Sequence, residues 1–141
     1  MKLNASSILK FMFIVGAVVD GVIAVTWFLI ASGIEMPNLL NGYKGAGFDY
    51  QLAMYVAAMF MTGWTILLVW GAVKPVERRD LLLITAALLI ISVVVELVFY
   101  GGALEGGGFV FGVTKRLVIS TAALAAYFYS FVNLKSIPDN R

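Results

Sequence analysis

Residues 81–100 read LLLITAALLIISVVVELVFY, and Glu96 is the only charged side chain among them. About 20 consecutive apolar residues in a helix span the roughly 30 Å hydrocarbon core of a bilayer. A helix on the surface of a soluble protein would instead carry a wide polar face, which this stretch lacks. We therefore predict that this segment crosses a membrane.

Three further stretches have the same character, and one of them, residues 52–73, contains no charged residue. Of the 141 residues, 62% are hydrophobic and 13% are charged. In soluble domains roughly 45–50% of residues are apolar and about 25% are charged. We predict an all-α integral membrane protein, a four-helix bundle with up-down-up-down topology. Its helices are expected at about 11–31, 52–73, 76–100 and 109–134, within a single transmembrane domain formed by residues 1–141.

The chain contains no cysteine and no histidine. Without cysteine it forms no disulfide and offers no thiolate to an iron–sulfur cluster. Without histidine it lacks the usual haem ligand and the commonest zinc ligand. We therefore expect no cofactor and no metal site. No basic patch interleaved with aromatic residues occurs outside the spans, so we expect no nucleic-acid partner either.

Lysine and arginine predict the orientation, because cytoplasmic flanks and short loops carry an excess of them. They gather in the N-terminal flank, between the second and third spans and in the C-terminal tail: Lys2, Lys10, Lys74, Arg78, Arg79, Lys135 and Arg141. The opposite side carries only Lys44 if Lys115 and Arg116 lie inside the fourth helix. We predict a multi-pass protein of the cell membrane with both termini in the cytoplasm.

The connections between the spans differ in length. The turn between the second and third spans is short, and Pro75 suits the first position of a helix. We therefore expect these two helices to be antiparallel neighbours. The connection at about 32–50 is long, and such loops tend to be functional. Gly108 and Gly112 match the GxxxG pattern, which predicts a close approach of helices, within the chain or between copies.

Four charged side chains lie within the predicted spans. Asp20 is near the middle of the first, Glu96 is in the outer third of the third, and Lys115 and Arg116 are in the outer third of the fourth. Each costs about 2.5–3.5 kcal/mol at such depth, so these side chains normally face protein or water and find partners. Because the third helix runs outward and the fourth inward, Glu96 and Arg116 are expected at similar depths.

Each predicted helix also carries a narrow stripe of small or polar residues at helical spacing. The stripes are Gly16, Asp20, Ala24 and Trp27; Gln51, Tyr55, Ala58, Thr62 and Thr65; Thr85, Ser92, Glu96 and Tyr100; and Arg116, Ser120, Ala123, Tyr127 and Ser130. In lipid such stripes mark the side of a helix that faces other helices. We predict that the four stripes converge on one axis.

The convergence predicts a polar, ligand- or ion-binding pocket in the outer half of the bundle. Asp20, Glu96 and Arg116 would form its centre, with Lys115 at the rim and Tyr55, Thr62, Tyr100 and Tyr127 in the walls. In the alternative interpretation, Glu96 and Arg116 form an ion pair that only fixes helix register, and Asp20 joins it. Asp20 itself either carries protons or meets a cationic substrate, or is a neutral acid bonded to a neighbouring helix.

Three functions remain open. The leading hypothesis is a non-enzymatic protein that binds or transports a small molecule, ion or lipid through this pocket. The second is a structural or accessory subunit of a larger membrane complex, or of a homo-oligomer, packed through apolar faces. The third is a lipid-modifying enzyme, but we identify no catalytic residue and no paired-acid metal motif. A ligand-shaped cavity favours the first hypothesis, and a dry packed interior favours the second.

Overall fold

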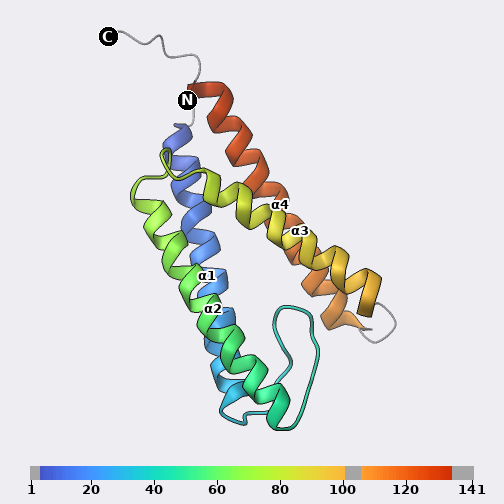
Figure 1. Cartoon of the computed structure of the whole chain (residues 1–141). Coiled ribbons are helices and arrows are strands. Elements are labelled where there is room, and N and C mark those ends of the chain that lie inside the picture. The colour runs from blue at the N-terminus through green and yellow to red at the C-terminus, as the bar shows by residue number, and fades with distance from the viewer. Residues whose placement is uncertain (1–3, 101–105, 135–141) are drawn as a thin grey trace.

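The computed structural model describes residues 4–100 and 106–134. This part of the chain forms four α-helices: α1 Ala5–Ala31, α2 Phe48–Val73, α3 Asp80–Tyr100 and α4 Gly107–Leu134. Each is long and apolar enough to cross a membrane. Even α3, with 21 residues, is about 32 Å long, against roughly 30 Å of hydrocarbon core. The predicted all-α bundle of four membrane helices running up, down, up and down is confirmed (Figure 1).

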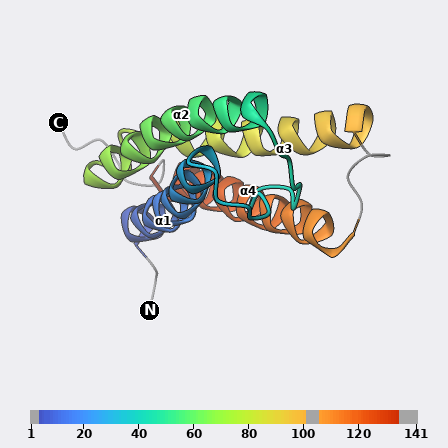
Figure 2. The same cartoon turned by 90° about the horizontal axis from the view of Figure 1, so that it is seen from below.

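The helices are arranged as two antiparallel hairpins, α1 with α2 and α3 with α4 (Figure 1). α1 also packs against α4, whereas α2 and α3 make only slight contact. The hairpins meet at the end where α1 begins and α4 ends, and they diverge toward the other end. Figure 2, seen from the divergent end, shows α3 and α4 extending away from α1 and α2. The bundle is therefore closed at one end and splayed at the other.

The short turn between α2 and α3 does not make them packed neighbours, so that prediction is wrong. Residues 74–79 form successive turns, and the Arg78 N–H donates to the Lys74 carbonyl at 3.1 Å. α3 begins at Asp80 and not at residue 76, and an acidic side chain is favourable in the first turn of a helix. A short connection brings only the joined ends together, and beyond them α3 packs on α4 instead.

α1 begins earlier than expected because a polar side chain caps it. Asn4 precedes Ala5, and its side-chain oxygen accepts the Ser6 N–H at 3.1 Å. Asparagine is among the preferred residues at this position, because it satisfies an N–H that has no partner within the helix. Lys115 and Arg116 lie inside α4, as predicted.

The buried core is divided between the two ends of the bundle. A cluster at the closed end draws on all four helices: Leu9, Phe13, Ala17, Leu68, Leu82, Ala86, Ala123 and Ala126. A second cluster draws only on α1 and α2: Ile23, Trp27, Ile30 and Ala58. Toward the splayed end, α1 and α2 therefore stay packed together while the other hairpin moves away from them.

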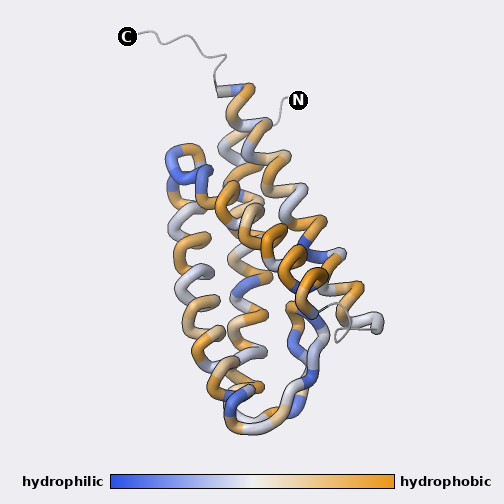
Figure 3. The backbone as a smooth tube through the Cα atoms, turned by 45° about the vertical axis from the view of Figure 1, so that its right-hand side comes forward, coloured by the Kyte–Doolittle hydropathy of each residue, from blue (hydrophilic) through white to orange (hydrophobic). Residues whose placement is uncertain are grey.

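Apolar residues dominate the helices on every side, as a lipid environment requires (Figure 3). Hydrophilic colour gathers along the connection between α1 and α2 and at the turn between α2 and α3, at opposite ends of the molecule. The start of α1 and the end of α4 lie at the same end (Figure 1). The chain is thus a multi-pass membrane protein, and the cytoplasmic location of its termini stays a prediction.

Candidate functional site

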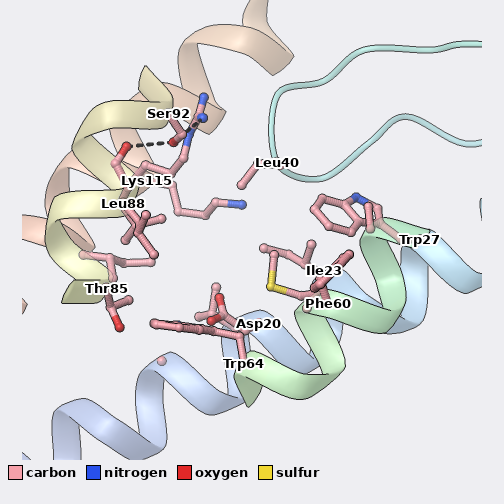
Figure 4. Close-up of a pocket in the computed structure, with 17 residues that line it drawn as sticks. Asp20, Ile23, Trp27, Leu40, Phe60, Trp64, Thr85, Leu88, Ser92 and Lys115 are labelled. Atoms are coloured by element: carbon pink, nitrogen blue, oxygen red, sulfur yellow. Dashed lines mark hydrogen bonds between the residues drawn. The ribbon is translucent and has the colours of Figure 1, made fainter. Parts of the chain in front are cut away.

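A cavity of about 420 Å³ occupies the space where the hairpins diverge (Figure 4). All four helices line it, together with Leu40 from the α1–α2 loop, residues 32–47. Its polar lining residues are Asp20, Thr85, Ser92, Lys115 and Arg116, and the rest of its wall is mainly apolar or aromatic. Ligand pockets measure about 300–1,000 Å³ and combine apolar walls with a few placed polar groups. The size and lining of this cavity fit that description.

The cavity has a side opening between α2 and α3. Phe60 on α2 and Leu88 on α3 both line the cavity, and they are 78% and 51% exposed. The two helices make only slight contact, so no continuous helix interface closes this side.

Asp20 and Lys115 both end in the cavity. Asp20 projects from α1 near its middle, and Lys115 reaches in from α4 (Figure 4). The Lys115 ammonium donates to the Leu39 carbonyl at 2.7 Å. Within residues 4–100 and 106–134, neither Asp20 nor Lys115 takes part in an ion pair, and no hydrogen bond reaches the Asp20 carboxyl group. A carboxylate and an ammonium thus share one cavity without neutralising each other.

Glu96 and Arg116 lie at similar depths, as predicted, and form the buried ion pair of the alternative interpretation. The Arg116 side chain is 1% exposed and that of Glu96 is 14% exposed. The guanidinium also donates to the Ser92 hydroxyl at 3.1 Å and to the Gly112 carbonyl at 3.2 Å. Arg116 borders the cavity, whereas Glu96 lies behind it, so this pair is a neutral part of the wall.

The predicted charge cluster is therefore smaller than expected. Of the four intramembrane charges, only Glu96 and Arg116 form an ion pair in the described parts of the chain. Asp20 does not join them, which contradicts the interpretation in which all three share one network. Two helices approach closely enough at Glu96 and Arg116 for direct contact, whereas the divergence of the hairpins separates Asp20 from both.

The α1–α2 loop connects the hairpins at the splayed end, where it passes between the arms (Figure 1). Asn38, 6% exposed, anchors it to the first hairpin, because its side-chain oxygen accepts the Trp27 indole N–H at 2.8 Å. The loop reaches the second hairpin through the Leu39 carbonyl, which accepts from Lys115, and through Asn41, whose amide donates to Glu96 at 3.2 Å. Leu40, between these two residues, lines the cavity.

The GxxxG pair of α4 contacts this loop and not another helix. A Cβ atom at Gly112 would overlap the Leu40 carbonyl group, whose carbon would lie 3.0 Å away. A Cβ at Gly108 would lie 3.1 Å from the Gly42 Cα. The predicted helix–helix approach within the chain is therefore wrong at these two glycines, because the segment that approaches them is the backbone of the α1–α2 loop.

The four uncharged residues predicted to form the walls do not line the cavity. Tyr55 and Tyr100 are 51% and 55% exposed. The Thr62 hydroxyl donates to a backbone carbonyl of its own helix. The Tyr127 ring centre lies 5.9 Å from the Arg79 guanidinium carbon, close to the turn between α2 and α3. The structure therefore brings Asp20, Lys115 and Arg116 to one cavity and leaves these four elsewhere.

α2 presents a different face to the cavity than its stripe of polar residues predicts. Its lining residues are Ala57, Phe60, Met61 and Trp64, which lie beside that stripe. Thr62 and Thr65 donate their hydroxyls to carbonyls four residues earlier, at 2.8 and 2.9 Å. These hydroxyls need no interhelical partner, but the Ser120 and Ser130 hydroxyls of α4 are also satisfied within their own helix, so this bonding does not by itself show which face turns inward. On α4, by contrast, four of the five stripe residues are buried: Arg116, Ser120, Ala123 and Ser130.

No family model, no curated protein and no solved structure matches this chain. Among the residues that the structure describes, no group of three or more acidic, histidine or cysteine side chains is placed to hold a metal ion. The functional argument therefore depends on the cavity and the side chains that line it.

Proposed function

We propose that this protein binds a small apolar or amphiphilic molecule in the cavity between its hairpins, without chemically altering it. The observation that carries the proposal is the cavity itself, which is about 420 Å³ in volume and is lined by all four membrane helices. Its mainly apolar wall suits the apolar part of a ligand, and its few polar groups can orient the rest.

The cavity supports this proposal over a structural role and over ion conduction. A dry, packed interior would favour a structural subunit, whereas here the hairpins leave a cavity between them. An ion pathway is lined by rings of carbonyl oxygens or charged side chains, whereas most of this lining is apolar. The side opening between α2 and α3 supports a ligand that enters from the bilayer. Binding therefore agrees better with the geometry than packing or ion conduction does.

Tryptophan fluorescence tests the proposal, because two of the three tryptophans, Trp27 and Trp64, line the cavity. Replacing Trp70 by Phe leaves these two as the only tryptophans. An alkyl detergent with a brominated chain, added at a small mole fraction to the micelles that hold the protein, should quench them. Quenching that saturates near one ligand per protein is the expected result, because a cavity holds a limited number of molecules.

Ala57→Phe provides the variant that fills the cavity, because Ala57 lines it. Ala53→Phe is the matched control, since Ala53 is an exposed residue one turn earlier on the same helix. Saturable quenching should be lost in the first variant and kept in the second, with both proteins folded by circular dichroism. Quenching that rises linearly with detergent in all three proteins would show that the cavity holds no ligand.

A further inference from the structure

The cavity contains one negative and one positive side chain that do not pair with each other. Asp20 and Lys115 both point into it (Figure 4), and no ion pair joins them among the described residues. The Lys115 ammonium has three hydrogens and gives one to the Leu39 carbonyl, so two remain for a ligand. The Asp20 carboxyl group keeps all of its acceptor capacity. Each charge is available to a group inside the cavity.

These two charges balance. Asp20 contributes one negative charge and Lys115 one positive charge, and the pair of Glu96 and Arg116 beside them is already neutral. A ligand with a net charge would satisfy one of these side chains and leave the other without a counter-charge. A head group that carries both signs satisfies both side chains and adds no net charge to the membrane interior.

The remaining wall of the cavity accommodates an apolar chain. Ile23 is a buried part of the lining, and Phe60 and Leu88 stand at its exposed edge. Because α2 and α3 make only slight contact there, a chain can leave through the side opening and continue into the bilayer.

From this arrangement we infer that the cavity recognises an amphiphile with a zwitterionic head group, whose cationic part contacts Asp20 and whose anionic part contacts Lys115. The inference rests on the proposed function, because it names the class of ligand for the same cavity. Apolar walls alone would bind an alkyl chain with any head group, whereas two opposite charges that are not paired with each other favour a head group that carries both signs.

Four amphiphiles with the same dodecyl chain test the inference by displacing the brominated detergent from the Trp70→Phe protein. Their head groups are phosphoethanolamine, which is zwitterionic, phosphate, ammonium and neutral maltoside. Hydrogen bonds to charged groups in a buried site change affinity by about tenfold or more. We therefore expect dodecyl phosphoethanolamine to displace the quencher at a concentration about ten times lower than the other three.

Single substitutions should invert this preference. Asp20→Asn leaves the cavity with a net positive charge, so the alkyl phosphate should become the tightest ligand. Lys115→Met leaves it with a net negative charge, so the alkyl ammonium should become the tightest ligand. Asp49→Asn and Lys44→Met remove the same charges from exposed positions outside the cavity and should leave the order unchanged. Asp20→Ser and Lys115→Gln replace any variant that does not fold.

The possible outcomes separate the inference from the proposed function. Equal displacement by all four head groups in the unsubstituted cavity would overturn the inference and keep the proposal that the cavity binds apolar chains. Preference for one net charge, with Asp20→Asn and Lys115→Met failing to invert it, would also overturn the inference. If the brominated detergent does not quench the tryptophans saturably, the proposed function fails first and the inference with it.

Discussion

Replacing Glu96 by Gln would remove the negative partner of a guanidinium that solvent does not reach. The Arg116 side chain is 1% exposed, and without the carboxylate its remaining partners are the neutral Ser92 hydroxyl and Gly112 carbonyl. A guanidinium cannot lose its proton in a protein, so the charge would stay in place. Removing one partner of a buried ion pair costs about 3–5 kcal/mol, and we expect the free energy of unfolding to fall by about that amount.

The opposite substitution, Arg116→Met, should cost less. It leaves a carboxyl group that is 14% exposed and still accepts the Asn41 amide at 3.2 Å, and a carboxyl group can take up a proton. The double variant Glu96→Gln with Arg116→Met contains no unpaired charge, and replacing a buried pair by neutral residues of similar size is often close to neutral. The double variant should therefore be more stable than Glu96→Gln alone.

Unfolding in mixed micelles of increasing denaturing-detergent content, followed by tryptophan fluorescence, measures these differences. The chain provides its own control in Lys74 and Glu77, an ion pair of 3.1 Å whose side chains are 56% and 65% exposed. Glu77→Gln should change the free energy of unfolding by less than about 1 kcal/mol. If Glu96→Gln proves as mild as Glu77→Gln, or if the double variant is less stable than both single variants, the reasoning is refuted.

Three further predictions concern the α1–α2 loop. Gly112→Ala should push the Leu40 carbonyl group, and with it the loop, away from α4 and lower the free energy of unfolding by about 1–3 kcal/mol. The reference is Gly63→Ala, because Gly63 is a helical glycine with open space around it. Trp27→Phe should cost about 0.5–1.5 kcal/mol in the same unfolding assay, because it removes one of the two donors to the buried Asn38 oxygen and leaves the Leu40 N–H at 2.9 Å as the other; an unchanged midpoint would contradict the anchoring role. A single cysteine introduced into the loop of this cysteine-free chain should react with an impermeant thiol reagent only from outside the cell, and labelling only from inside would reverse the predicted orientation.

Much of the architecture could be predicted because it depends on each segment alone. Whether a stretch such as residues 81–100 crosses the bilayer follows from its length and apolarity, since a helix satisfies its own backbone hydrogen bonds in lipid. The common depth of Glu96 and Arg116 was predictable for a similar reason, because the rise per residue places both at one level on antiparallel helices, whereas their ion pair was one of two interpretations that the sequence left open.

The contacts of the α1–α2 loop could not be read from the chain in this way. Its anchoring depends on Asn38 meeting Trp27 and on Asn41 meeting Glu96, residues 11 and 55 positions apart. No periodic pattern marks such partners, because each forms its contact through a particular backbone turn. The glycines of α4 signalled a close approach but carried no information about which segment approaches.

From the residues alone it follows that the chain has four segments able to cross a membrane and that Glu96 and Arg116 lie at similar depths within it. The packing of the folded chain makes the hairpins diverge, turns Trp64 of α2 toward the gap, and brings Asp20 and Lys115 into one cavity without pairing. The physical reason lies in the solvent. Lipid solvates every apolar helix face about equally well, so hydrophobicity determines which segments span the membrane but not which faces pack together. The faces that pack are determined by the shapes of the helix surfaces.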